Sequence, residues 1–170
     1  MNNIEPVPLT LFRVQHGSSF TYHDENEGFV AKGHYWMDYS HWVNPTKVRK
    51  HLDWWDKSSE PSPFISLFSN LPDARERASF HQGKGHRDIV IAQVNLTETV
   101  PYRLRIQFPE GPIELPGRIH PATSTMFFPM HEVGPRFHIG AVQRSEWLAL
   151  LSIPPELITY LPFPSSEYRN

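Results

Sequence analysis

Cysteine is absent from this 170-residue chain, which excludes disulfides, a thiol nucleophile and thiolate metal sites. No apolar run approaches the roughly 20 residues of a membrane-spanning helix. The first residues lack the basic and apolar regions of a secretory signal peptide. The formal net charge is −2, so no basic field points to nucleic acid. These absences predict no membrane partner and leave open the oligomeric state and the compartment, whether cytoplasmic or that of a delivered effector.

Glycine is sparse, with nine residues, whereas proline is frequent, with 17. This balance predicts many short elements joined by turns rather than a helix bundle, because proline interrupts helices. Hydrophobic residues at 39% and aromatic residues at 13% indicate a globular chain. The length suits one core. We therefore predict a single domain over residues 1–170.

Several common catalytic motifs are also missing. There is no GxSxG elbow and no GxGxxG fingerprint, and Gly83-Lys84-Gly85 lacks the spacing of a phosphate-binding P-loop. The chain has ten histidines, but the closest pair, His81 and His86, is five residues apart, and no HExxH motif occurs. We therefore expect histidines scattered on loops and predict no metal site, although distant histidines could still assemble one.

One apolar block stands out between serines and prolines. Residues 64–68, Phe-Ile-Ser-Leu-Phe, have the length and composition of a buried strand. The following Asn-Leu-Pro-Asp opens a helix that runs through Ala78. Ser66 lies inside this strand, and its buried hydroxyl must find a hydrogen-bond partner. Taken alone, Ser66 is expected to bond a neighbouring backbone group.

Two further strands carry charged residues. Residues 9–14 form a predicted strand in which Arg13 continues an apolar face. Arg13 either snorkels to an edge or offers its planar fork to a carboxylate or phosphate. Residues 146–153 form another predicted buried strand, and Glu146 stands at its start. Residues 27–33 are flanked by glycines, which suits either a turn close to a ligand or an ordinary loop.

The remaining chain completes a mixed pattern. Asn44 and Pro45 predict a capped helix ending near Lys57. Residues 15–28 are polar and irregular, and strands are predicted over 89–94 and 136–142. The proline-rich stretch 101–135 is expected to hold short edge strands and a long ordered loop. Together these elements predict an α+β fold around a split antiparallel sheet.

Arg13, Ser66 and Glu146, on three separate strands, resemble the arginine–serine–glutamate clade of the ADP-ribosyltransferase fold. That clade includes the cholera-type enterotoxins and the pierisin-like and scabin-like toxins. Residues 11–14 resemble its first-strand arginine motif, residues 27–33 its glycine-flanked stretch, residues 64–68 its aromatic–hydrophobic–Ser–Thr–Ser strand, and residues 146–154 its catalytic-glutamate strand. The Ser-Pro-Phe-Ile-Ser stretch and the late Ile-Pro-Pro-Glu also resemble an uncharacterised fungal domain family thought to share this fold.

The resemblance implies ADP-ribosyltransferase-like split antiparallel β-sheets with flanking helices. It also implies a NAD-dependent mono-ADP-ribosyltransferase that cleaves the nicotinamide–ribose bond of its substrate NAD and passes ADP-ribose to a protein or nucleic-acid acceptor. Glu146 would hold the ribose hydroxyl and stabilise positive charge. Arg13 would clamp the diphosphate or its ribose side, and Ser66 would orient Glu146 and support the nicotinamide end. Gly28 and Phe29 would add contacts to NAD.

The chain departs from the family pattern at two places. Leu67 and Phe68 replace the Thr-Ser pair after the motif serine. Arg144 stands two residues before Glu146, where arginine-modifying families carry Glu and several nucleic-acid-modifying families carry Gln. By position, Gln143 and Arg144 are the candidates for acceptor recognition. The departures keep two alternatives open: a catalytically silent binding or effector module, and a NAD glycohydrolase toxin that uses water as acceptor.

Overall fold

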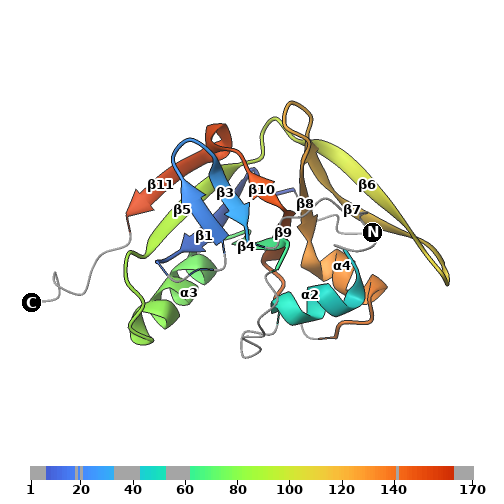
Figure 1. The fold of residues 1–170 in the computed structure, drawn as a ribbon, viewed down its shortest axis with the longest axis horizontal. Coiled ribbons are helices and arrows are strands. Elements are labelled where there is room, and N and C mark those ends of the chain that lie inside the picture. The colour runs from blue at the N-terminus through green and yellow to red at the C-terminus, as the bar shows by residue number, and fades with distance from the viewer. Residues whose placement is uncertain are drawn as a thin grey trace, which may run out of the picture.

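The computed structural model describes residues 7–32 apart from 18 and 20, and residues 43–52, 62–140 and 142–162. Within these residues two antiparallel sheets are flanked by helices, so the predicted α+β class is confirmed (Figure 1). The helices are α2 (Pro45–Leu52), α3 (Leu71–Gly83) and α4 (Met130–Arg136), with a short 3-10 helix at Pro155–Leu157. Over the described residues, no helix has the length and apolar character needed to cross a membrane.

The larger sheet has eight strands. Their spatial order is β11 (Ile158–Pro162), β5 (Val90–Asn95), β1 (Thr10–Gln15), β4 (Phe64–Phe68), β9 (Glu146–Leu150), β8 (Thr125–Pro129), β7 (Gly111–His120) and β6 (Val100–Phe108). The smaller sheet has the order β10 (Ser152–Ile153), β3 (Gly28–Ala31) and β2 (Thr21–Asp24). Strands β1, β4 and β9, which carry the three candidate residues, are therefore neighbours.

The large sheet opens between β1 and β4. Strand β1 pairs with β5 from Thr10 to Gln15, and β4 pairs with β9 along its whole length. Between β1 and β4, by contrast, the register holds only the pair Phe12–Phe68. Beyond this pair the backbone groups that face across the gap need other partners. This opening is where Arg13 and Ser66 lie.

The predicted strand over 146–153 is two strands rather than one. Leu151 adopts a left-handed conformation with φ 68°, which turns the chain after β9. Its backbone remains satisfied, because its N–H donates to the carbonyl of Pro63 and its carbonyl accepts from Ala31. The chain then continues as β10, which pairs with β3. The bend carries the chain from the large sheet into the small one.

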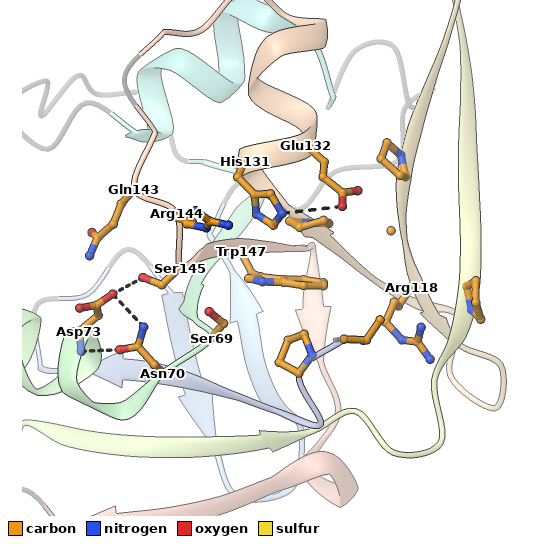
Figure 2. A pocket seen from close by; sticks show the side chains of 16 residues that line it. Ser69, Asn70, Asp73, Arg118, His131, Glu132, Gln143, Arg144, Ser145 and Trp147 are labelled. Carbon is orange, nitrogen blue, oxygen red and sulfur yellow. Dashed lines mark hydrogen bonds and ion pairs between the residues drawn. The ribbon is translucent and has the colours of Figure 1, made fainter. Parts of the chain in front are cut away.

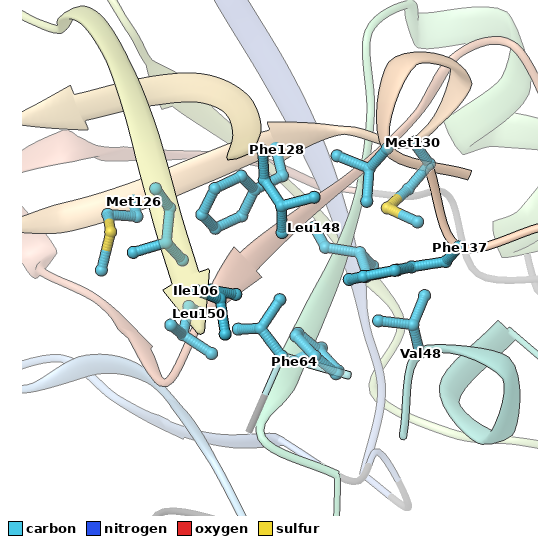
Figure 3. Packing of buried hydrophobic residues seen from close by; sticks show 13 residues of the cluster. Val48, Phe64, Ile106, Met126, Phe128, Met130, Phe137, Leu148 and Leu150 are labelled. Carbon is cyan, nitrogen blue, oxygen red and sulfur yellow. The ribbon is translucent and has the colours of Figure 1, made fainter. Parts of the chain in front are cut away.

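The hydrophobic core covers both faces of the large sheet. On one face, side chains of β4 and β6–β9 pack against α2 and α4, in a cluster that includes Val48, Phe64, Phe137 and Leu148 (Figure 3). The opposite face of the central strands packs against β3 and β10. Helix α3 packs Ala74 and Ala78 against Val14, Phe68 and Ile91. Helices α2 and α3 thus both lie beside β4.

Of the short edge strands and long ordered loop predicted within residues 101–135, an edge strand is present as β6, whereas the long loop is wrong. Strands β6 and β7 form a long hairpin, followed by β8 and the start of α4. Prolines are tolerated there because β6 is an edge strand and β7 pairs with β8 only from Arg118 to His120, so Pro112 and Pro116 need no second partner strand. Leu104 and Ile106 alternate with exposed residues, which is the strand pattern that the prolines obscured.

The ends of other elements also differ from prediction. The described part of the strand predicted over 136–142, residues 136–140 and 142, is not a strand, because α4 ends at Arg136 and the N–H groups of Phe137 and Ile139 turn back to the carbonyl of Gly134. Strand β2 lies within the stretch expected to be irregular. The Asn44 cap of α2 is confirmed by a 3.0 Å bond to its Oδ1 from the N–H of Lys47. Residues 53–57 of the predicted helix lie outside the described residues.

Candidate functional site

Arg13 bridges the opening between β1 and β4. Its Nη1 donates to the carbonyl of Ser66 at 3.1 Å, and its Nε and Nη2 donate to Oε1 of Gln15 at 3.3 and 3.1 Å. Gln15 in turn donates to the carbonyl of Thr21 at 2.9 Å. Burial, reinforced by the charge of Arg77, lowers the pKa of Arg13 to about 10. The guanidinium is therefore a fixed, half-buried cation with neutral oxygens as its hydrogen-bond partners.

The hydroxyl of Ser66 contacts a histidine rather than the backbone. His51 Nε2 lies 2.6 Å from Ser66 Oγ, and His51 Nδ1 lies 2.6 Å from Ser62 Oγ. Ser62 also accepts a bond from the N–H of Phe64 at 3.1 Å. Burial, with the charges of Arg13 and Arg77, lowers the pKa of His51 to about 3. Such a ring is a weak general base near neutral pH, so it positions Ser66 instead of activating it.

Glu146 is a buried carboxyl at the first position of β9. The residue is 4% exposed, and its Oε1 has no hydrogen-bond partner among the described residues. Burial raises the pKa of Glu146 to about 7, and the charge of Arg77 opposes this rise. Glu146 pairs with Phe68, and Ser66 is two residues from Phe68 on β4. Side chains two apart on a strand share a face, so Glu146 and Ser66 project from the same side of the sheet.

Arg77 of α3 connects the two ends of this cluster electrostatically. Its guanidinium lies 5.3 Å from the centre of the Phe68 ring. Its charge lowers the pKa of Arg13 and of His51, and it favours the ionised form of Glu146. Sequence reasoning missed both Arg77 and His51. The only available signal was that each lies on a helix flanking the Ser66 strand.

The structure brings the three sequence-predicted residues onto adjacent strands with unequal contacts. Arg13 binds the Ser66 carbonyl directly, whereas Glu146 is related to Ser66 by the shared face and to Arg13 through the field of Arg77. The cluster combines two guanidinium groups, a positioned hydroxyl and a carboxyl that titrates near neutral pH. Such a set can hold an anionic ligand and stabilise a developing positive charge beside it.

Gly28 and Phe29 have packing roles. Gly28 has φ 78°, and a Cβ there would lie 2.1 Å from the carbonyl oxygen of Ile153. The glycine therefore lets β3 approach the end of β10 closely. Phe29 is 0% exposed and lies in the core beneath the central strands. Phe29 consequently offers no surface that a cofactor could touch in this structure.

Gln143 and Arg144 line a separate groove of about 990 Å³ (Figure 2). Ser145 and Trp147 line it as well, together with Asp73 at the start of α3. The Asp73 carboxylate accepts hydrogen bonds from Ser145 Oγ, from Asn70 and from Gln143. These bonds, that of Ser145 first, lower the pKa of Asp73. The candidates for acceptor recognition thus lie on the groove side of β9, and Glu146 is not among the lining residues.

Comparison with known proteins finds one family. A model of DUF7587, described as a domain of unknown function, matches residues 6–164. Neither a curated protein nor a solved structure matches the chain.

Proposed function

The chain belongs to the DUF7587 family, and we propose that it is a NAD-dependent mono-ADP-ribosyltransferase acting on a protein or nucleic-acid acceptor. One observation carries the proposal. Arg13, Ser66 and Glu146 stand on three adjacent strands, where Arg13 contacts Ser66 and Glu146 keeps a buried carboxyl oxygen without a hydrogen bond on the face of the Ser66 hydroxyl. This is the residue set and order of the arginine–serine–glutamate clade that the sequence resembles.

The carboxyl of Glu146 suits the bond that has to break. Departure of neutral nicotinamide from the ribose C1′ leaves an oxocarbenium-like centre, which a neighbouring carboxylate stabilises as in glycosidases. The ionised carboxylate would accept a hydrogen bond from a ribose hydroxyl. An acceptor nucleophile or water then bonds to C1′ and loses its proton. A bound nicotinamide cation would itself favour ionisation of Glu146, whose pKa is about 7 without it.

Arg13 and Arg77 supply the positive charge for the diphosphate. Arg13 is held by its bonds to Ser66 and Gln15, so its orientation is set before NAD arrives. A guanidinium carries five N–H donors, and three of those of Arg13 are engaged in these bonds. The Ser66 hydroxyl, positioned by His51, would support the nicotinamide end.

Release of nicotinamide from NAD tests the proposal. We expect Glu146→Gln to lower the rate by roughly a hundredfold or more, because it removes one electrostatic contact to the transition state. NAD affinity, measured by isothermal titration, should change far less, since this contact strengthens as the bond breaks. Glu110→Gln, in the exposed β6–β7 turn, is the matched control and should keep the wild-type rate.

The outcomes separate the alternatives. Unchanged nicotinamide release in Glu146→Gln contradicts the assignment of Glu146. A wild-type chain that binds NAD without releasing nicotinamide is a silent binding module. Release without ADP-ribose on any protein or nucleic acid, checked by mass spectrometry, identifies a NAD glycohydrolase.

A further inference from the structure

Three histidines from two distant segments of the sequence meet at the end of α3. His16 follows β1, His81 lies in the last turn of α3, and His86 follows the helix. One ring nitrogen from each lies within 4.8 Å of the others. The prediction of scattered histidines does not hold for these three, because folding places the end of β1 beside the end of α3.

Backbone bonds hold this arrangement. The N–H of His86 donates to the carbonyl of His81 at 3.1 Å, which curls the chain back after the helix. The N–H of Gly17 donates to the carbonyl of Arg87 at 3.0 Å, which ties the residue after His16 to the residue after His86. The three side chains are therefore brought together by main-chain geometry on both sides of the cluster.

The three histidine rings lie close together, and one of them has a buried nitrogen without a hydrogen-bond partner among the described residues. The ring centre of His16 lies 4.3 Å from that of His81 and 4.2 Å from that of His86. His16 is buried and the other two are half-buried. The Nδ1 atom of His81 is buried without a hydrogen-bond partner among the described residues. A neutral imidazole has one ring nitrogen with a free lone pair, and this lone pair is what a metal ion binds.

We propose that His16, His81 and His86 bind one divalent transition-metal ion of the zinc class, with a fourth coordination position left for water or an external ligand. Imidazole nitrogen suits Zn²⁺, Cu²⁺ and Ni²⁺, whereas Ca²⁺ and Mg²⁺ require oxygen ligands. Zinc–nitrogen bonds of about 2.0–2.1 Å place tetrahedral ligands roughly 3.3 Å apart. The rings therefore need a modest inward adjustment from the observed spacing when the metal enters.

Two of the three histidines lie close in sequence to the arginines of the candidate site. His16 is three residues after Arg13, and His81 is one helical turn after Arg77. A metal held by these histidines would fix the end of β1 against the end of α3, and with them the elements that carry both arginines. Beyond burial and the charge of His16, the charges of Arg77 and Arg13 lower the pKa of His81, so they oppose a cation there. The metal site does not depend on the proposed function.

Zinc titration of the metal-free full chain, in competition with a chromophoric chelator, tests the site. We expect one Zn²⁺ per chain, and at least about a tenfold loss of affinity in His86→Gln, because even outer-shell changes at zinc sites cost ten- to hundredfold. His138→Gln, an exposed histidine in the turn after α4, is the matched control and should bind as the wild type does. No saturable binding, or equal losses in the two variants, overturns the proposal.

A second measurement keeps the test independent of variant folding. Co²⁺ added to the metal-free wild-type chain should give the intense visible absorption of a low-coordinate, nitrogen-ligated ion, saturating at one equivalent and displaced by Zn²⁺. Zn²⁺ should also raise the thermal midpoint of the wild type, since it binds the folded state. A weak, octahedral Co²⁺ spectrum at one equivalent contradicts a three-histidine site.

Discussion

Glu146 and Trp147 are consecutive residues of β9, so their side chains project from opposite faces of the large sheet. Glu146 is buried and shares its face of the sheet with the half-buried Ser66. Trp147 lies beside the open groove that Arg144 and Asp73 also line (Figure 2). Alternation of side chains along a strand thus gives one strand two different chemical surroundings.

Two carboxyl groups, Asp73 in the groove and Glu146 outside it, show what the difference in surroundings means. Asp73, on the groove side, is surrounded by hydrogen-bond donors, and its pKa is lowered. Glu146 is buried with an unpaired oxygen, and its pKa is raised to about 7. Hydrogen bonds stabilise the ionised form, whereas burial destabilises it. An unsatisfied carboxyl that costs folding free energy is the feature expected of a reactive site, and a carboxylate satisfied by hydrogen bonds is typical of a structural role.

The largest expected effect concerns the pH dependence of stability at Glu146. Its folded pKa of about 7 lies above the unfolded value of 4.5, so the wild type loses stability as pH rises between them. Glu146→Gln lacks this loss and should gain on the wild type by about 3 kcal/mol between pH 4 and pH 8. Urea unfolding at pH 4, 6 and 8 measures the gain. A difference that stays constant with pH would show that the carboxyl is not desolvated.

The next effect concerns His51 and has the opposite sign. Its folded pKa of about 3 lies below the unfolded value of 6.5, so the wild type loses stability as pH falls through this range. The loss should reach about 2 kcal/mol at pH 5. His51→Gln should be less stable than the wild type by about 1 kcal/mol at pH 7, through its altered bonds to Ser62 and Ser66. At pH 5 the order should reverse, and the variant should be the more stable by about 1 kcal/mol.

Urea unfolding of the wild type and of His51→Gln at pH 7 and pH 5 tests whether His51 is neutral in the folded chain. His138→Gln is the control, because this exposed histidine has no part in the cluster. If the gap between His51→Gln and the wild type widened at pH 5, the ring would be charged in the folded chain. The assignment of His51 as a neutral positioning group for Ser66 would then fail.

Local sequence signals predicted the elements whose patterns are complete within a few residues. The apolar block of β4 was recognised because both faces of this central strand are buried. The start of α3 was recognised from Asn70, which caps the N–H of Asp73 at 2.9 Å. The β6–β7 hairpin was missed because its prolines are harmless only where a partner strand is lacking on one side. Whether a partner strand is present depends on the tertiary structure, so the local sequence does not reveal it.

The residues of the candidate site likewise fall into those that the sequence predicts and those that only the tertiary structure brings together. Arg13, Ser66 and Glu146 could be named because each sits within or beside an apolar strand and together they match a family pattern. His51 and Arg77 could not, because helix packing rather than spacing brings them to those strands. The three-histidine cluster is the extreme case. Its members come from two segments that meet only after β1 and α3 have packed.

The smallest expected effect lies on the groove side, at Ser145. Its hydroxyl donates to the Asp73 carboxylate, so Ser145→Ala should cost about 1 kcal/mol of unfolding free energy at pH 7. The folded pKa of Asp73 is lowered from 3.8, so this stability is present above that value and is lost as pH falls through the folded pKa. Ser145→Ala and the wild type should therefore converge in strong acid, where the wild type also weakens. Ser69→Ala, in the same groove, is the control. A cost at Ser145 that persists unchanged in acid would mean that packing, and not the charge on Asp73, distinguishes this side of β9.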